Sequence, residues 1–358
     1  MQQIIPVTRA FLPPLADLVE LLQGIWASGH LTNNGPLLKQ LEQELIPYHG
    51  APHVLFATNG TITLQLALRA LDISGEVITT PYSYVATTSA LLWERCTPVF
   101  VDIEPDGFNI DADRIEAAIT PRTQAILATH VYGIPCRTEE IARIAAKHGL
   151  KVIYDAAHAF GTTYKGKPLL SYGDVSSCSF HATKLFHTVE GGSLACADPQ
   201  LYRRLGLMRS FGHVKDEHYA VGINAKNSEL HAAVGLLVIR HFSSILERRK
   251  QQWLRYAAGL HDLRIARVPA DTDHNGSYFP VVFGSEATVH RVLGALDAIG
   301  VVPRRYFYPA LTTLPYLTAP ASCPIAEAVA ARVLCLPLYH DLAAADIDRI
   351  VACVRANA

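Results

Sequence analysis

The feature that most constrains the fold is an alternation, between residues 54 and 197, of short apolar runs with stretches of helical spacing. This alternation is typical of βα units, whose strands pack into a largely parallel or mixed sheet covered by helices. The predicted strands are residues 77–80, 98–103, 125–131, 151–154, 176–180 and 193–197. Sheets of this kind bind ligands at the carboxyl ends of their strands, so functional residues are expected there.

Helix boundary signals lie between the predicted strands. Asp111 can cap a helix that carries Ile115 and Ile119 on one face, and Thr138 can cap a second helix that Gly149 ends. These signals support an α/β fold.

The βα pattern becomes weaker in the last third of the chain. Residues 224–240 have helical spacing, with Leu230, Val234 and Leu237 in one stripe, and residues 247–263 predict a long connecting helix. Beyond that helix the sequence has fewer βα repeats and more proline and aromatic residues. We therefore predict a large domain with the N-terminal segment (1–245) and a smaller C-terminal domain (246–358).

Composition excludes several classes of partner. Lys and Arg total 31 against 32 Asp and Glu, so no net charge recruits nucleic acid or an anionic membrane. The seven cysteines are odd in number and form no C-x-x-C pair, which argues against a disulfide framework and a zinc site. No apolar run approaches the ~20 residues of a membrane span, and no signal peptide is evident. We expect a soluble, cytoplasmic protein without a metal that binds a small molecule.

Lys184 lies just after the predicted strand 176–180 and is followed by Glu190-Gly191-Gly192. A shielded site lowers the pKa of a lysine and leaves a nucleophilic amine that can form a Schiff base with an aldehyde cofactor. Taken alone, Lys184 fits a solvated surface residue better. The choice between the two depends on its surroundings.

Two further segments favour a phosphorylated ligand with a ring nitrogen. Gly60 and Thr61 precede a helical stripe, so they are expected at a helix N-terminus that can bind a phosphate, or form a plain N-cap. Asp155 ends an apolar strand, where a charge needs a cation or a donor, although a turn-capping role is open. His158 can lie against the same ligand or in the core.

Tyr84, in the segment 81–87, offers an aromatic face on which a planar ring can stack, unless it belongs to the core. A phosphate site, an acid for a ring nitrogen, a stacking aromatic and an amine together match pyridoxal phosphate. The combination is far more specific than any of its members.

At these residues the chain resembles the DegT/DnrJ/EryC1/StrS family of sugar aminotransferases. The resemblance runs along nearly the whole chain and includes residues 31–36 (LTNNGP), 59–61 (NGT), 81–87 (PYSYVAT), 155–158 (DAAH), 179–184 (SFHATK), 222–226 (GINAK) and 336–338 (LPL). It implies the aspartate aminotransferase fold (fold type I), with a mixed, mostly parallel sheet and a smaller C-terminal α+β domain.

The resemblance also implies roles for single residues. Lys184 would hold the cofactor covalently, Asp155 would pair with the pyridine nitrogen, and Tyr84 would stack on the ring. Gly60, Thr61 and Ser179 would bind the phosphate, and His158 would lie beside the ring. Asn224 would reach the phosphate from the neighbouring subunit, which makes the protein a homodimer with composite sites.

Three positions depart from the family's commonest pattern and leave the local loop geometry open: Val189, Ile223 and Asn227. A separate cluster in the second domain is expected to contact a diphosphate or sugar, or to form an exposed basic loop: Arg304, Arg305, Tyr306 and Tyr308.

The implied reaction is transamination between L-glutamate and a nucleotide-linked ketosugar, with pyridoxamine phosphate as the intermediate form of the cofactor. Within the family, the likeness is to enzymes that aminate dTDP-4-keto-6-deoxyglucose, in deoxyaminosugar biosynthesis for O-antigen or another polysaccharide. Amination at C3 of a dTDP-3-keto-6-deoxyhexose and a non-catalytic regulator that binds the cofactor remain alternatives. Related dehydratases carry histidine at the position of Lys184, so the lysine argues against a dehydratase activity for this chain.

Overall fold

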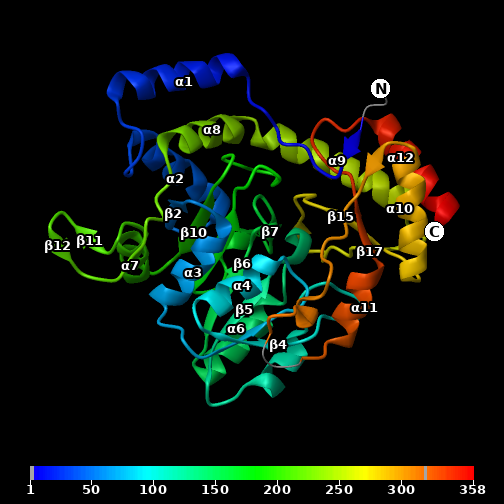
Figure 1. The fold of residues 1–358 in the computed structure, drawn as a ribbon, viewed down its shortest axis with the longest axis horizontal. Helices are drawn as coiled ribbons and strands as arrows, with labels where there is room; N and C mark the ends of the chain where they lie inside the picture. The colour runs from blue at the N-terminus through cyan, green and yellow to red at the C-terminus, as the bar shows by residue number, and fades with distance from the viewer. Residues whose placement is uncertain (1–3, 318–320) are drawn as a thin grey trace.

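The computed structural model describes residues 4–317 and 321–358, and its centre is a seven-stranded sheet in the order β2-β10-β9-β6-β5-β3-β4 (Figure 1). All neighbouring strands are parallel except that β10 runs antiparallel to β2 and β9. The sheet is therefore mixed and mostly parallel, as predicted. The strands are β2 (His53–Ala57), β3 (Glu76–Thr79), β4 (Thr97–Phe100), β5 (Thr123–Thr129), β6 (Lys151–Asp155), β9 (Val175–Ser179) and β10 (Gly192–Cys196).

The six predicted strands all exist, each within a few residues of its predicted bounds, whereas β2 is absent from the prediction. Both faces of the sheet are covered. In β3, Val77 belongs to the cluster under α3 (Gly60–Ala70) and its neighbour Ile78 to the cluster under α6 (Thr138–His148). Successive residues of a strand point to opposite faces, so β3 contributes apolar side chains to a core on each side of the sheet.

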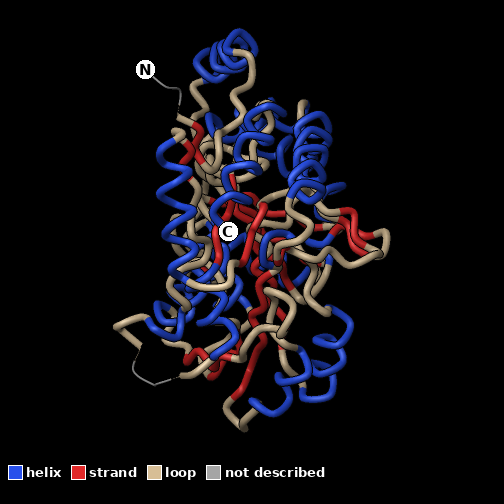
Figure 2. The backbone as a smooth tube through the Cα atoms, turned by 90° about the vertical axis from the view of Figure 1, so that its right-hand side faces the viewer, coloured by secondary structure: helices blue, strands red, loops and turns tan. Residues whose placement is uncertain are grey.

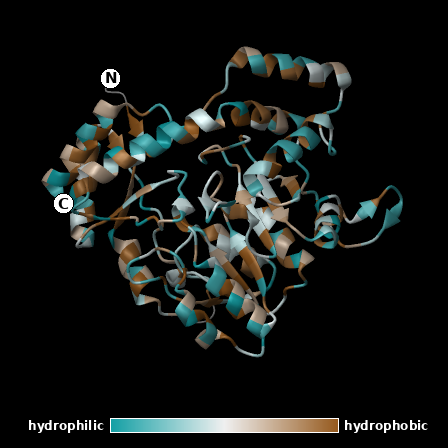
Figure 3. Cartoon of the chain, turned by 180° about the vertical axis from the view of Figure 1, so that it is seen from behind, coloured by the Kyte–Doolittle hydropathy of each residue, from teal (hydrophilic) through white to brown (hydrophobic). Residues whose placement is uncertain are grey.

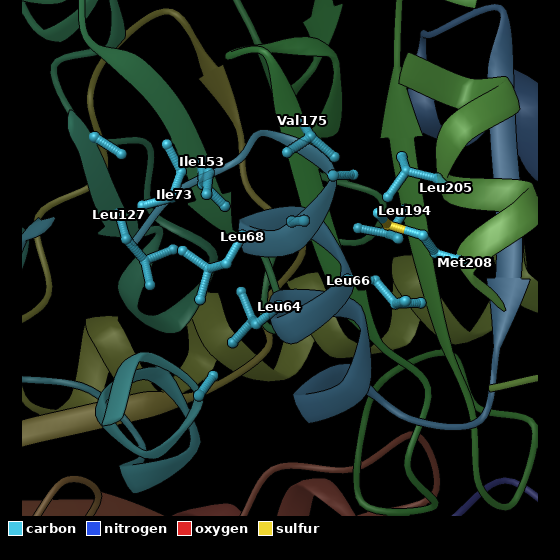
Figure 4. Packing of buried hydrophobic residues seen from close by; sticks show 14 of the residues in the cluster. Leu64, Leu66, Leu68, Ile73, Leu127, Ile153, Val175, Leu194, Leu205 and Met208 are labelled. Atoms are coloured by element: carbon cyan, nitrogen blue, oxygen red, sulfur yellow. The ribbon is translucent and has the colours of Figure 1, made fainter. Parts of the chain in front are cut away.

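Helix α3 forms the centre of one helical layer (Figure 4). The predicted stripe of α3 is confirmed, because Leu64 and Leu68 are buried and Leu71 packs against the same cluster. The helices around the large sheet are α2 (Pro36–His49), α4 (Val85–Trp93), α5 (Ala112–Ile115), α7 (Pro199–Arg209) and α8 (Glu229–Arg240).

Two predicted helix boundaries are wrong and two are confirmed. Thr138 does not cap α6, because it is the first helical residue and Arg137 occupies the N-cap position. Asp111 does cap α5, accepting a hydrogen bond from the Asp113 backbone, and Gly149 ends α6 with a φ of 68°. Helix α8 begins only at Glu229, because the Ser228 side chain caps it there.

The predicted long helix is α9 (Phe242–Gly259), which begins and ends a few residues before the predicted bounds. Among the described residues no single helix could cross a membrane by length and composition, and only α8 and α9 pass that test together, bent by 61°. All seven cysteines are free, and six of them are buried. The predicted absence of a disulfide framework is thus confirmed.

Beyond α9, an antiparallel three-stranded sheet, β13-β15-β17, packs with helices around its own cluster of apolar residues. Figure 1 shows β15 and β17 beside the large sheet, and Figure 2 looks onto that side of the molecule, with the C-terminus near the centre of the view. The predicted α+β character of the C-terminal part is confirmed, and the division at residue 245 stays a prediction. The elements are β13 (Arg264–Ile265), β15 (Phe279–Val282), β17 (Val333–Leu336), α10 (Glu286–Ala298), α11 (Pro324–Arg332) and α12 (Ala344–Asn357).

The N-terminal segment contacts both parts of the molecule. Strand β1 (Ile5–Pro6) pairs in parallel with β16 (Val301–Val302), beside the C-terminal sheet. The chain then crosses to α1 (Leu15–Ser28), which contacts α8 and carries exposed apolar residues (Figure 3). The hairpin of β11 (His213–Val214) and β12 (Glu217–His218) projects from the same side of the molecule (Figure 1).

Candidate active site

A cavity of about 590 Å³ opens at the carboxyl ends of the central strands, against the C-terminal part of the chain. Residues from both parts line this cavity. The large sheet and its loops contribute Asn59, Gly60, Thr61, Ser83, Tyr84, Asp155, His158, Ser177, Ser179, His181, Thr183, Lys184 and Glu190, and the C-terminal part contributes Tyr278, Arg304, Tyr306 and Phe307.

Lys184 lies in the loop after β9, and its Nζ donates a hydrogen bond to Tyr278 Oη at 3.3 Å. The expectation of a lowered pKa is wrong for this arrangement. Burial lowers the pKa of Lys184, but the hydroxyl of Tyr278 and the carboxylate of Asp155 outweigh burial, so the pKa is raised. The amine is held as a hydrogen-bonded cation, which needs a partner or a ligand to release its proton.

Asp155 ends β6 and is 5% exposed. Its Oδ2 accepts a hydrogen bond from Thr87 Oγ1 at 2.7 Å, and its Oδ1 accepts one from the Ala157 backbone at 3.1 Å. Burial raises the pKa of this carboxyl group, and the bonds from Thr87 and Ala157 and the charge of Lys184 offset only part of that effect. A further cationic donor at this carboxylate would therefore stabilise its charged form.

The N-terminus of α3 forms one wall of the cavity. Asn59 caps it by accepting a hydrogen bond from the Ile62 backbone at 2.9 Å. The backbone N–H groups of Gly60 and Thr61 follow, and the first N–H groups of a helix have no acceptor within it. A side-chain carbon at residue 60 would lie 2.9 Å from Ser179 Cβ, so glycine allows the helix to approach β9 this closely.

Tyr84 is the N-cap residue of α4, lines the cavity and is 57% exposed. The other tyrosine of the segment, Tyr82, is fully buried and bonded to the Tyr132 hydroxyl. The structure thus places Tyr84, as predicted, at the cavity and Tyr82 in the core.

His158 lies beside Asp155 with its ring stacked on Phe307, the ring centroids 5.4 Å apart. Its Nδ1 accepts a hydrogen bond from the Tyr132 backbone at 3.3 Å, so a neutral ring carries its proton on Nε2. Burial lowers the pKa of His158 well below its ordinary value. Within the described residues Nε2 has no partner, which leaves a buried donor available to a ligand.

The predicted sugar-binding cluster divides between two environments, and its role stays a prediction. Arg304 and Tyr306 line the cavity, whereas Arg305 and Tyr308 do not. The guanidinium of Arg305 is held by Glu286 at 2.7 Å and by the Ala331 carbonyl at 2.8 Å, and it covers the ring of Tyr308. The contacts of Arg305 with Glu286 and the Ala331 carbonyl thus keep its side chain, and the ring of Tyr308 that it covers, out of the cavity that Arg304 and Tyr306 line.

Asn224 does not line the cavity of its own chain. It is exposed, and its Oδ1 accepts a hydrogen bond from Lys226 Nζ at 2.9 Å. This position is compatible with the expected reach into a neighbouring subunit, and that role stays a prediction.

The three departures from the family pattern have different structural consequences. Val189 has a φ of 67°, a left-handed conformation that strains a β-branched residue and that glycine adopts freely. Asn227 is buried and donates to the carbonyls of Ala57 and Glu190, so its polarity is satisfied. Ile223 is 42% exposed.

The sequence interpretation missed several residues of the site, and three of them contact predicted ones. Thr87 belongs to the quoted motif 81–87, and only the structure shows that it donates to Asp155. Tyr278 and Phe307 come from the C-terminal part, where no local pattern marks them. Their proximity to Lys184 and His158 arises from packing between segments about a hundred residues or more apart.

These groups fit pyridoxal phosphate. The cavity offers free helical N–H groups and hydroxyls for a phosphate, a buried carboxylate that needs a cationic donor, an unpaired histidine donor and an amine. No group of three or more metal-ligating side chains occurs in the described parts of the chain.

Residues 16–355 match the DegT/DnrJ/EryC1/StrS aminotransferase family. The dTDP-4-amino-4,6-dideoxy-D-glucose transaminase of Shigella dysenteriae is 40% identical over 364 residues, 99% of each chain. The enzyme of the same name from Escherichia coli is 42% identical over 351 residues, 94% of each chain.

Solved structures have the same fold. DesI, crystallised with its TDP-sugar product, is 36% identical with a TM-score of 0.93, over 99% of this chain and 93% of its own. The sugar aminotransferase Spr1654 of Streptococcus pneumoniae in its PLP form is 28% identical with a TM-score of 0.91, over 99% and 98% of the two chains. Its PMP form aligns equally well.

Proposed function

Because this chain belongs to the DegT/DnrJ/EryC1/StrS aminotransferase family, we propose that it aminates dTDP-4-keto-6-deoxy-D-glucose at C4. The product would be dTDP-4-amino-4,6-dideoxy-D-glucose, and the amino donor would be L-glutamate. The proposal includes a cytoplasmic location and a role in making deoxyaminosugars for O-antigen or another polysaccharide, both of which rest on the family resemblance alone.

The observation that carries this proposal is the meeting of Lys184, Asp155, Ser179 and the N-terminus of α3 in one cavity. Lys184 and Asp155 come from neighbouring parallel strands, β9 and β6, and the charge of each favours the charged form of the other. The aminotransferases of this family use pyridoxal phosphate, and the cavity offers a partner for each of its polar groups.

Different residues of the cavity would contact different parts of the cofactor. Gly60, Thr61 and Ser179 would hold the phosphate, Asp155 would keep the pyridine nitrogen protonated, and Lys184 would hold the cofactor covalently. When bound, pyridoxal phosphate supplies an electron sink that makes the Cα proton of an amino acid acidic. The amine of Lys184, once free, would carry the proton taken from Cα of glutamate.

Arg304 and Tyr306 are proposed contacts of the nucleotide sugar. The guanidinium of Arg304 lies at the cavity and can bind two phosphate oxygens at once. Its position on the C-terminal side, opposite α3, would separate the diphosphate of the substrate from the phosphate of the cofactor.

A homodimer would complete the site through Asn224. Asn224 lies close in sequence to the β11–β12 hairpin, which carries exposed apolar residues, and α1 exposes others on the same side of the molecule (Figure 1). Large apolar side chains left exposed on one side of a molecule are a feature of interfaces. The exposed residues are Leu15, Val19 and Trp26 of α1 and Phe211, Val214, Tyr219 and Val221 around the hairpin.

The test is product identification with purified protein, pyridoxal phosphate, L-glutamate and a panel of dTDP-ketosugars, by mass spectrometry and NMR. We expect amination at C4. The Lys184→Ala variant should lose turnover and the borohydride-fixed adduct, because among the described residues that line the cavity Lys184 is the only lysine. Lys165→Ala, which removes an exposed lysine paired with Glu139, should keep both.

Full turnover by Lys184→Ala would refute the assignment. A product aminated at C3 would replace the proposed substrate with a dTDP-3-keto-6-deoxyhexose, and cofactor binding without turnover of any ketosugar would favour a regulator. If sites are composite, mixing inactive Lys184→Ala with an inactive Asn224→Ala variant should restore activity, because mixed dimers contain one intact site.

A further inference from the structure

Tyr278 is the direct partner of Lys184 in the cavity. Its hydroxyl oxygen lies 3.3 Å from Lys184 Nζ, and the amine lies 5.9 Å from the centre of its ring. Tyr278 comes from the C-terminal part of the chain, immediately before β15, whereas Lys184 follows β9 of the large sheet. The contact therefore joins the two parts of the molecule at the proposed reacting amine.

Helix α9 fixes the backbone of the segment 276–278 through three successive carbonyl groups. Arg249 donates to the Gly276 carbonyl at 3.1 Å and to the Ser277 carbonyl at 2.7 Å. Trp253, one turn along α9, donates from Nε1 to the Tyr278 carbonyl at 3.2 Å. Three consecutive bonds from one rigid helix leave the Tyr278 backbone little freedom.

Arg249 is unusual as a support for a loop. It is 4% exposed, and burial lowers its pKa to about 10. Among the described residues it meets carbonyl oxygens and no carboxylate, so its charge depends on those bonds. Removing a guanidinium from water costs free energy, and here two backbone carbonyls are its partners. This arrangement indicates that Arg249 serves to fix the position of the segment.

The same segment is bonded to the loop that follows Asp155. Ser277 Oγ donates to the His158 carbonyl at 2.7 Å, and Asn275 Nδ2 donates to the His158 and Phe160 carbonyls at 2.8 and 2.9 Å. The segment thus lies between α9 and the loop after β6, and Tyr278 is held on both sides.

We propose that Tyr278 is a positioning residue for Lys184, whose hydroxyl keeps the free amine directed into the cavity in both of its protonation states. A phenol can do this because its oxygen accepts a hydrogen bond from an ammonium group and its O–H donates one to a neutral amine. The role rests on the proposed function of Lys184 as the reacting amine, and neither the family motifs nor the predicted site include Tyr278.

Several titratable groups face Lys184, and their effects on its pKa differ. Burial lowers the pKa, whereas Tyr278, Asp155 of β6 and Cys178 of β9 raise it. His158 and Tyr306 also lie close to that charge: burial and the charge of Lys184 both lower the pKa of His158, whereas burial raises the pKa of Tyr306 and Lys184 offsets part of that rise. Since Asp155 is needed for cofactor binding, Tyr278 is the partner that can be changed separately.

The test compares the pH dependence of Lys184 acetylation in wild-type and Tyr278→Phe protein without cofactor, using acetic anhydride and peptide mass mapping. Phenylalanine keeps the ring and its packing and removes only the hydroxyl. Without that acceptor the ammonium form is less stable, so the labelling midpoint should move to lower pH by about one unit. An unmoved or higher midpoint would overturn the proposal.

Two further variants separate positioning from general packing. Tyr306→Phe removes a neighbouring hydroxyl in the same cavity that does not bond Lys184, and it should leave the midpoint nearly in place. Trp253→Phe removes the donor to the Tyr278 carbonyl and should shift the midpoint in the same direction as Tyr278→Phe, but less. A Tyr306→Phe shift as large as that of Tyr278→Phe would also overturn the proposal.

Borohydride trapping with pyridoxal phosphate distinguishes this inference from the proposed function. If wild-type protein forms no adduct at residue 184, the proposed function fails whatever the labelling shows. If the adduct forms and the labelling midpoints coincide, only the role of Tyr278 fails.

Discussion

Thr87 is the side chain that keeps the carboxylate of Asp155 in place. Its hydroxyl is fully buried, bonds Ser83 at 2.7 Å and donates to Asp155 at 2.7 Å. Thr88, the next residue of α4, is equally buried, but its hydroxyl has no partner within the described part of the chain. Thr88 is therefore a matched control for Thr87, because the two residues are equally buried and only Thr87 bonds Asp155.

We predict that Thr87→Val moves the acid limb of the pH–activity profile of the loaded enzyme to higher pH. Thr87 lowers the pKa of Asp155, so its loss raises that pKa and protonates the carboxylate at a higher pH. A hydrogen bond to a charged group contributes about 1.5–3 kcal/mol, enough for a shift of about one unit. Thr88→Val should leave the profile unchanged, and equal profiles for both variants would contradict the prediction.

At the residue scale, the sequence predicts those site residues whose position follows from one strand end or one helix start. Asp155, Ser179 and Gly60 are of this kind, because the edge of a parallel sheet brings them together. Tyr278 is not, because α9 positions it by contacts that no local pattern encodes. The predicted lowering of the Lys184 pKa is wrong for the same reason. The local sequence indicates burial, which lowers that pKa, but it does not indicate the Tyr278 hydroxyl, which raises it.

At the scale of elements, the buried carboxylate of Glu229 links α8 to the N-terminus of α2. It is the first residue of α8, is 1% exposed, and accepts hydrogen bonds from the backbones of Leu37 and Leu38 at 2.8 and 3.0 Å. These N–H groups begin α2, so a buried carboxylate caps that helix and interacts with its dipole.

We predict that Glu229→Gln lowers the free energy of unfolding by about 1–3 kcal/mol. The amide keeps one acceptor, loses the charge and places a donor against the helix N-terminus. Thermal unfolding of the holoenzyme measures the loss. Glu247→Gln, which changes an exposed carboxylate of α9 that accepts a hydrogen bond from Gln251, is the control and should leave the unfolding temperature unchanged. A holoenzyme equally stable with either change would show that the charge of Glu229 does not hold α2 to α8.

The predicted helix bounds failed where side chains compete to cap a helix. The predictions for Asp111 and Gly149 are correct, because each residue acts within its own turn. Thr138 is the first residue of α6 rather than its predicted N-cap, and Ser228 is the N-cap residue of α8. The sequence offers several capping candidates close together, and tertiary contacts decide between them.

At the scale of the whole molecule, buried neutral histidines make stability depend on pH. Burial lowers the pKa of His49 to about 4 and that of His274 to about 4, while backbone carbonyls bonded to each ring offset part of the effect. Burial alone lowers the pKa of His130 to about 3. All three rings are neutral in the folded protein and free to take up a proton after unfolding.

We predict that the unfolding temperature is nearly constant between pH 7 and 8 and falls between pH 6.5 and 4. In that range the unfolded chain binds more protons than the folded one, so stability decreases as pH decreases. Each ring contributes up to about 1.4 kcal/mol per pH unit, or roughly 3 kcal/mol by pH 4. His49→Gln, measured by calorimetry from pH 7.5 to 4.5, should reduce the slope, and an unchanged slope would contradict this account.

The pairing of β1 with β16 has a consequence for how the protein is made. Ile5 lies beside Val301, so about 300 residues must be synthesised before the first strand meets its partner. At ~5–20 residues per second a ribosome needs roughly 15–60 s for that length. Thr8, which follows β1, donates to the Thr183 carbonyl next to Lys184. The loop that carries Lys184 therefore acquires this neighbour only near the end of translation, because a nascent chain that still lacks β16 cannot yet hold β1 in place.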